Sequence, residues 1–183
     1  MNTTNYAHEI IRELRAAVED ISEAEAEKLV NAILAANKVF VVGAGRSGLM
    51  GKAFVMRMMH MGIDAYVVGE TVTANMEKGD LLIVGTGSGE TKTLIPVAEK
   101  AKALGGTVAM VTLSPDSTIG KLADLTVTLA GAPKDQAGGE YGTIQPMGSL
   151  FEQAMLMFYD AVILRFMEKK GLTPIKCMVS MQI

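Results

Sequence analysis

Short apolar runs that end in glycine constrain the fold of this chain most. KVFVVG (38–43), AYVVG (65–69) and DLLIVG (80–85) share this form, and TVAMVTL (107–113) and DLTVTL (124–129) follow. Runs that are apolar throughout are typical of strands buried on both faces of a parallel sheet. Helical segments over 47–60 and 91–104 separate them, so the pattern predicts an α/β fold with helices covering both faces of the sheet.

Helices and one long loop are predicted around this core. Apolar spacing over 10–18 predicts a first helix, and Ser22 with Glu25 has capping-box spacing for a second helix ending near Ala36. A helix over 149–171 is apolar on nearly every side, so we expect it to be buried and to contact another subunit. We divide one domain, 1–183, into amino-terminal helices (1–37), a core (38–130), a loop (131–148), the closing helix (149–171) and a tail (172–183).

Composition excludes several classes of function. The net charge is only −3 with 20% charged residues, which argues against a nucleic-acid partner. Cys177 is the single cysteine, so no internal disulfide can form, and zinc-type Cys and His spacings do not occur. No apolar run of about 18 residues and no export-type amino terminus occurs. We therefore predict a cytoplasmic protein that has no membrane partner.

Two similar turns, GAGRSG (43–48) and GTGSGET (85–91), follow the first and third of these strands. Glycine allows close backbone approach, and the free amides at a helix start attract an anion. The hydroxyls of Ser47, Thr86, Ser88 and Thr91 can donate to phosphate oxygens, and Arg46 adds a cation. The two turns together predict a site for a phosphate monoester.

Other interpretations of these turns stay open. Gly43, Gly45 and Gly48 match the dinucleotide fingerprint, with Glu70 at about the position of its ribose-binding acid. The second hydroxyl-rich turn counts against this reading, because a dinucleotide site does not need it. Each turn could also be only a tight connection, with Ser88 or Thr91 as helix caps.

Two titratable residues have both a structural and a functional interpretation. Glu152 lies three residues after Ser149, which is capping-box spacing, yet a carboxylate beside a phosphate site could also move a proton between adjacent sugar carbons. His60 precedes a glycine at a helix end, where a cation interacts favourably with the helix dipole. We expect His60 to act only if tertiary or subunit packing brings it to the site.

GAGRSG, GTGSGET and IQPMGSLFEQ (144–153) together resemble the sugar isomerase (SIS) domain family. The likeness runs from the amino-terminal helices to about residue 172. It implies a three-layer sandwich with a five-stranded parallel sheet and a homotetramer with sites near subunit interfaces. It also implies no metal and no nucleotide or other cofactor.

Within the family, the chain is most similar to isomerases that move the carbonyl of a hexulose 6-phosphate from carbon three to carbon two. The reaction belongs to the ribulose monophosphate pathway of formaldehyde assimilation. The resemblance implies that Glu152 accepts the proton and that Arg46 stabilises the enediolate. His60 is a secondary catalytic candidate, because a 3-ketohexose 6-phosphate is open-chain and a dedicated ring-opening residue matters less than in aldose isomerases. The implied phosphate ligands are Gly45, Ser47, Thr86, Gly87, Ser88, Gly89, Glu90 and Thr91.

The chain departs from its relatives at the tail, 173–183, which has no histidine, and at Thr86, where a serine is common. Two alternative functions stay open. One is a phosphosugar-binding SIS module without catalysis, and the other is an aldose-ketose isomerase of the arabinose 5-phosphate type.

Overall fold

The sheet of the protein is parallel throughout and contains five strands. A computed structural model describes residues 2–132 and 142–173. The strands are β1 (Val39–Gly43), β2 (Ala65–Val67), β3 (Leu81–Gly85), β4 (Thr107–Thr112) and β5 (Leu125–Thr128), in the order β2-β1-β3-β4-β5. This confirms the predicted α/β class and the five-stranded parallel sheet.

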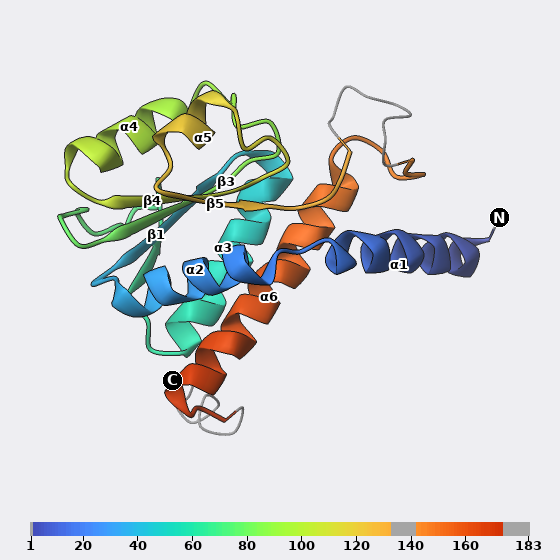
Figure 1. The fold of residues 1–183 in the computed structure, drawn as a ribbon, viewed down its shortest axis with the longest axis horizontal. Helices are drawn as coiled ribbons and strands as arrows, with labels where there is room; N and C mark the ends of the chain where they lie inside the picture. The colour runs from blue at the N-terminus through green and yellow to red at the C-terminus, as the bar shows by residue number, and fades with distance from the viewer. Residues whose placement is uncertain (1, 133–141, 174–183) are drawn as a thin grey trace.

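Helices cover both faces of this sheet (Figure 1). One layer contains α4 (Ile95–Ala103) and α5 (Thr118–Leu122), and the other contains α2 (Glu23–Ala35), α3 (Gly45–His60) and α6 (Ser149–Lys170). Alternate residues of β1 point to opposite layers: Val39 and Val41 join the core with α6, whereas Phe40 and Val42 join the core with α4. A strand with apolar residues on both faces therefore needs both helical layers.

The first helix, α1 (Thr3–Glu19), extends away from the sheet (Figure 1). Its carboxyl-terminal half is anchored by Leu14 and Ala17, which pack with Leu150 and Ala154 of α6. This contact joins α1 to the first turns of α6.

Two helix predictions need correction, and one helix was missed. The helix predicted over 91–104 begins only at Ile95, because the Thr91 carbonyl closes a turn with the Leu94 and Ile95 amides and Pro96 favours a start there. The five-residue helix α5 was not predicted. The Ser22 hydroxyl caps α2, but the Glu25 carboxylate accepts from the Thr128 amide of β5 at 2.8 Å instead of completing the capping box.

Two sequence predictions concern residues outside the described ranges. Half of the predicted loop (133–141 of 131–148) and nearly all of the histidine-free tail (174–183, with Cys177) lie there. The predicted closing helix is confirmed as α6, and it is buried largely against its own chain. Among the described residues, no helix has the length and apolar character needed to cross a membrane.

Candidate active site

A cavity of about 460 Å³ opens where the carboxyl ends of β1, β3 and β4 meet. The strand order reverses between the neighbouring strands β1 and β3, because β1 is followed by β2 on one side and β3 is followed by β4 on the other. Ligands of open α/β sheets bind at such a reversal of strand order. Ser47, Thr86, Gly87, Ser88 and Thr91, predicted as phosphate ligands, all line the cavity. The other lining residues are Ala44, Gly85, Leu113, Ser114, Ala132, Gly148 and Phe151.

Strand register places the two predicted turns side by side. Gly43, which ends β1, is paired with Gly85, which ends β3. The first turn is tight, since a Cβ on Gly48 would lie 2.6 Å from the Gly43 carbonyl oxygen. Gly45 has φ +58°, a left-handed conformation that favours glycine. Ala44, the N-cap of α3, and Ser47 in its first turn both line the cavity, so the start of this helix lies beside it and can attract an anion.

The second turn is held by its own hydroxyl groups. Thr86 Oγ1 accepts from the Gly89 amide at 3.3 Å and lies 3.3 Å from Thr91 Oγ1, while Ser88 Oγ accepts from the Glu90 amide at 3.2 Å. No described residue accepts a hydrogen bond from the amides of Gly87 and Ser88. These two amides can donate to a bound anion. The interpretation of Ser88 or Thr91 as helix caps is wrong, because α4 has Leu94 at its N-cap.

Gly89 and Glu90 do not line the cavity. The Glu90 carboxylate accepts from the amide and the hydroxyl of Thr118 at 2.7 and 2.8 Å, and these bonds lower the Glu90 pKa below its usual value. Gly89 has φ +64°, and a Cβ there would collide with Ser117. Both residues therefore fix the turn against α5, whereas their neighbours face the cavity.

Glu152 and Arg46 form an ion pair beside the cavity. Glu152 Oε2 lies 2.9 Å from Arg46 Nη1, and Glu152 is 4% exposed whereas the Arg46 side chain is 49% exposed. Arg46 supplies the positive charge that a buried carboxylate needs. Gly45, Arg46 and Glu152 are not among the lining residues, but Arg46 precedes the lining residue Ser47 and Glu152 follows the lining residue Phe151, so the ion pair lies near the cavity.

Ser149 does not cap α6, so the capping-box interpretation of Ser149 and Glu152 is wrong. The N-cap is Gly148, and the Ser149 hydroxyl donates to the Pro146 carbonyl at 2.7 Å while accepting from Arg46 Nη1 at 2.8 Å. Ser149 therefore holds the Arg46 guanidinium, which in turn contacts Glu152.

His60 and Glu70 lie away from this constellation. His60 is the last residue of the 16-residue helix α3, about 24 Å along the axis from its start. Its Nδ1 lies 3.3 Å from Arg57 Nη1. The carboxylate of Glu70, the candidate ribose ligand, pairs with Lys52 at 2.5 Å. Within one chain, the structure does not bring His60 to the cavity.

Sequence comparison identifies the family. A model of the SIS domain matches residues 32–164, a span that includes both turns and Glu152. The chain belongs to the SIS domain family. It is 58% identical to 3-hexulose-6-phosphate isomerase of Bacillus subtilis (strain 168) over 94% of this chain and 93% of that protein. It is 36% identical to 3-hexulose-6-phosphate isomerase of Methylomonas aminofaciens over 92% of each chain.

A solved structure agrees with these relatives. A protein of Methanococcus jannaschii, whose crystal structure infers a molecular function of 3-hexulose-6-phosphate isomerase, superposes with a TM-score of 0.78. Its sequence is 33% identical, and the match covers 94% of this chain and 93% of that one. The SIS fold is therefore shared across the length of the chain.

Several lining residues were missed by sequence reasoning. Leu113 and Ser114 directly follow β4, so the rule that located the two turns could have found them. Gly148 and Phe151 belong to IQPMGSLFEQ, the segment that carries the family resemblance and Glu152, but they were not themselves predicted to line the site. Among residues 2–132 and 142–173, no group of three or more His, Cys, Asp or Glu side chains could hold a metal ion.

Proposed function

We propose that this chain is a 6-phospho-3-hexuloisomerase, also called 3-hexulose-6-phosphate isomerase. It converts D-arabino-hex-3-ulose 6-phosphate into fructose 6-phosphate. The observation that carries the proposal is the 58% identity to the Bacillus subtilis isomerase over 94% of the chain. The cavity supports it, because hydroxyl groups and free amides suited to a phosphate lie next to a buried carboxylate.

The phosphate is proposed to bind in the two turns. The Gly87 and Ser88 amides, the start of α3 and the hydroxyls of Ser47, Ser88 and Thr91 supply donors from two sides of the cavity. Gly45 allows the backbone bend of the first turn, and Gly89 and Glu90 hold the second turn against α5. Thr86 keeps the hydroxyl of the serine that relatives commonly have and uses it to close the turn.

Glu152 is proposed to carry the proton between carbons two and three. As a carboxylate it takes the proton from carbon two, the C2–H electron pair forms the C2–C3 double bond, and the carbonyl oxygen on carbon three becomes an enediolate oxygen. Glu152 then returns a proton to carbon three. The hydroxyl proton on O2 passes to O3, which leaves a carbonyl at carbon two.

Arg46 is proposed to stabilise the enediolate. An arginine guanidinium acts in proteins as a fixed positive group and not as a proton donor, which suits it to negative oxygens that develop during a reaction. The half-exposed Arg46 guanidinium contacts both Glu152 and Ser149. A substrate oxygen could also accept a hydrogen bond from this guanidinium while the contact with Ser149 stays in place.

The assay couples hexulose-phosphate synthase, ribulose 5-phosphate and formaldehyde to this protein and measures fructose 6-phosphate. Wild-type protein should form product, and Glu152→Gln should abolish turnover while still binding substrate. Glu168→Gln is the matched control, because Glu168 lies on the same helix but is exposed and pairs with Arg165. Binding without product by the wild type would favour the non-catalytic module. Faster conversion of arabinose 5-phosphate would favour the aldose-ketose isomerase.

We retain three further proposals. The chain acts in the ribulose monophosphate pathway, it assembles as a homotetramer with sites near subunit interfaces, and it is cytoplasmic. In such an assembly His60 could reach the site of a neighbouring subunit. A His60→Asn variant with lowered turnover would support that role, and unchanged turnover would remove it.

A further inference from the structure

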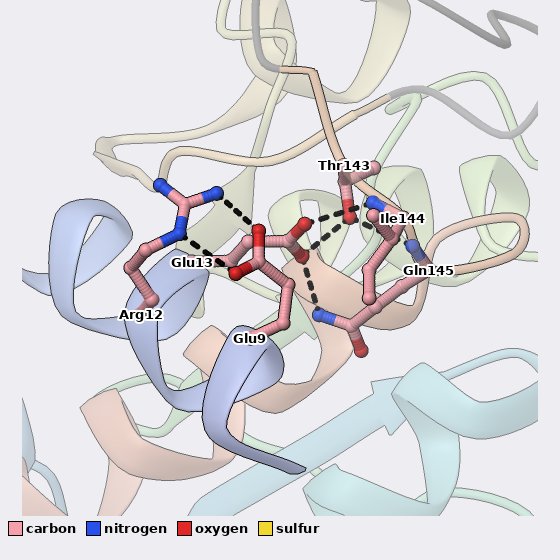
Figure 2. Close-up of polar contacts among 6 residues, drawn as sticks. All are labelled: Glu9, Arg12, Glu13, Thr143, Ile144 and Gln145. Carbon is pink, nitrogen blue, oxygen red and sulfur yellow. Dashed lines mark hydrogen bonds and ion pairs between the residues drawn. The ribbon is translucent and has the colours of Figure 1, made fainter. Parts of the chain in front are cut away.

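Three donors of the segment 143–145 converge on the Glu13 carboxylate of α1 (Figure 2). Thr143 Oγ1 donates to Oε2 at 2.6 Å, Gln145 Nε2 donates to Oε2 at 2.9 Å, and the Ile144 amide donates to Oε1 at 2.8 Å. Glu13 is only 5% exposed, although most of α1 is exposed. We name these four residues the Glu13 clamp.

The charge of Glu13 is stabilised by hydrogen bonds. The neighbouring Arg12 is paired with Glu9 (Figure 2), and no described Lys, Arg or His lies within salt-bridge distance of Glu13. A buried carboxylate without its donors is costly, so the clamp favours one position of the segment 143–145.

The clamped segment leads directly to the catalytic pair. The Pro146 carbonyl, one residue after Gln145, accepts from Ser149 Oγ at 2.7 Å. Ser149 Oγ accepts from Arg46 Nη1 at 2.8 Å, and Arg46 pairs with Glu152 at 2.9 Å. A continuous series of short contacts therefore connects Glu13 on α1 with Glu152 on α6.

The backbone between clamp and helix is in a strained conformation. Met147 has φ 55°, the one positive value among the described residues that are not glycine. A left-handed conformation at such a residue persists only where the surrounding structure enforces it. Glu13 fixes the segment on one side of Met147, and α6 begins on the other. The packing of Leu14 and Ala17 against Leu150 and Ala154 holds α1 itself in place.

We infer that Glu13 is a positioning residue for the isomerase reaction, acting through the segment 143–149 on Arg46 and Glu152. The inference rests on the proposed function. It makes α1, which extends away from the sheet, part of the support of the active site.

The test is Glu13→Gln, a change of nearly equal size that removes the charge and one acceptor oxygen. We expect kcat to fall by about tenfold to a hundredfold, as for other small displacements of reacting groups. KM should change less than about twofold, because the phosphate turns are untouched. The matched control is Glu25→Gln, since Glu25 is also a helix-borne carboxylate that accepts from a backbone amide. The control should keep wild-type kcat.

Rescue separates positioning from general destabilisation. Combining Glu13→Gln with Gln145→Glu restores an amide-to-carboxylate hydrogen bond and should recover part of kcat. If Glu13→Gln does not fold, Thr143→Val removes one donor and should lower kcat severalfold at unchanged KM. Wild-type kcat in Glu13→Gln or in Thr143→Val would overturn the inference. So would an equal loss in Glu25→Gln, or a double variant no better than the single one.

The outcomes also separate this inference from the proposed function. If wild-type protein forms no fructose 6-phosphate, the proposed function fails. If the wild type is active, Glu152→Gln is inactive and Glu13→Gln equals the wild type, only the positioning role of Glu13 fails.

Discussion

Replacing Gly48 by alanine tests whether the close approach between β1 and α3 builds the first turn. Gly48 lies inside α3, and alanine in place of glycine within a helix ordinarily stabilises a protein by about 1 kcal/mol. Here the new Cβ would lie 2.6 Å from the Gly43 carbonyl oxygen and 3.0 Å from its carbon. Both are backbone atoms, so strand β1 or helix α3 must shift.

The clash should outweigh the gain in helix propensity. Overpacking of this kind costs about 3 kcal/mol, at the upper part of its usual range because no side chain can move aside. The net loss is about 2 kcal/mol, which lowers Tm by about 4–8 °C for a chain of this size. The shift also moves the start of α3 relative to the turn after Gly85, so KM for the sugar phosphate should rise.

The control is Gly51→Ala, one turn later on the same helix. Its Cβ would meet only Val41 Cγ1, at 3.0 Å, and a side-chain methyl can yield. Thermal denaturation at one fixed protein concentration should therefore give a Tm within about 2 °C of the wild type for Gly51→Ala. A Tm for Gly48→Ala equal to that of Gly51→Ala, or above the wild type, would refute this account of the turn.

Two further predictions concern buried polar groups. Tyr159 is fully buried, and its hydroxyl has no hydrogen-bond partner among the described residues. Because a buried hydroxyl without a partner destabilises the fold, Tyr159→Phe should raise Tm by about 2–4 °C. A lower Tm for this variant would contradict the prediction. Burial tends to raise the pKa of Glu13, but the bonds from Thr143, Gln145 and Ile144 outweigh it and hold the pKa below the ordinary 4.5. The hydrogen bonds of the Glu13 clamp therefore stabilise the folded protein fully above the pKa that Glu13 has in the unfolded chain. This stabilisation is lost as pH falls through the pKa that Glu13 has in the folded protein. The Tm difference between wild type and Glu13→Gln should be constant at neutral pH and shrink below pH 4.5, and a difference that does not shrink would contradict the lowered pKa.

The strands and the two turns could be predicted because their signals are local. Five apolar runs separated by helical segments leave few alternatives to a parallel sheet, and each turn is written in consecutive residues. That the turns lie together also follows from the sequence, because strands of a parallel sheet end at the same edge. The exact pairing of Gly43 with Gly85 needed the structure.

Contacts between distant residues could not be predicted in the same way. Ser149 and Glu152 match a capping box locally, but the Ser149 hydroxyl interacts with Arg46, 103 positions away. The Glu13 clamp joins residues 130–132 positions apart, and no motif marks Glu13 among the other acids of α1. The helix was predicted to begin at Thr91, but it begins at Ile95, because the Thr91 hydroxyl contacts Thr86 in the turn and does not cap the helix.

The central claim is that Glu152 transfers a proton between carbons two and three of a hexulose 6-phosphate through an enediolate. The most direct measurement is conversion of the substrate in D₂O, with the product analysed by NMR. The account predicts that Glu152→Gln gives neither product nor deuterium exchange, whereas the wild type forms fructose 6-phosphate that carries deuterium on carbon three in those turnovers in which protonated Glu152 exchanges with solvent. Product formation or deuterium incorporation by Glu152→Gln at the wild-type rate would contradict it.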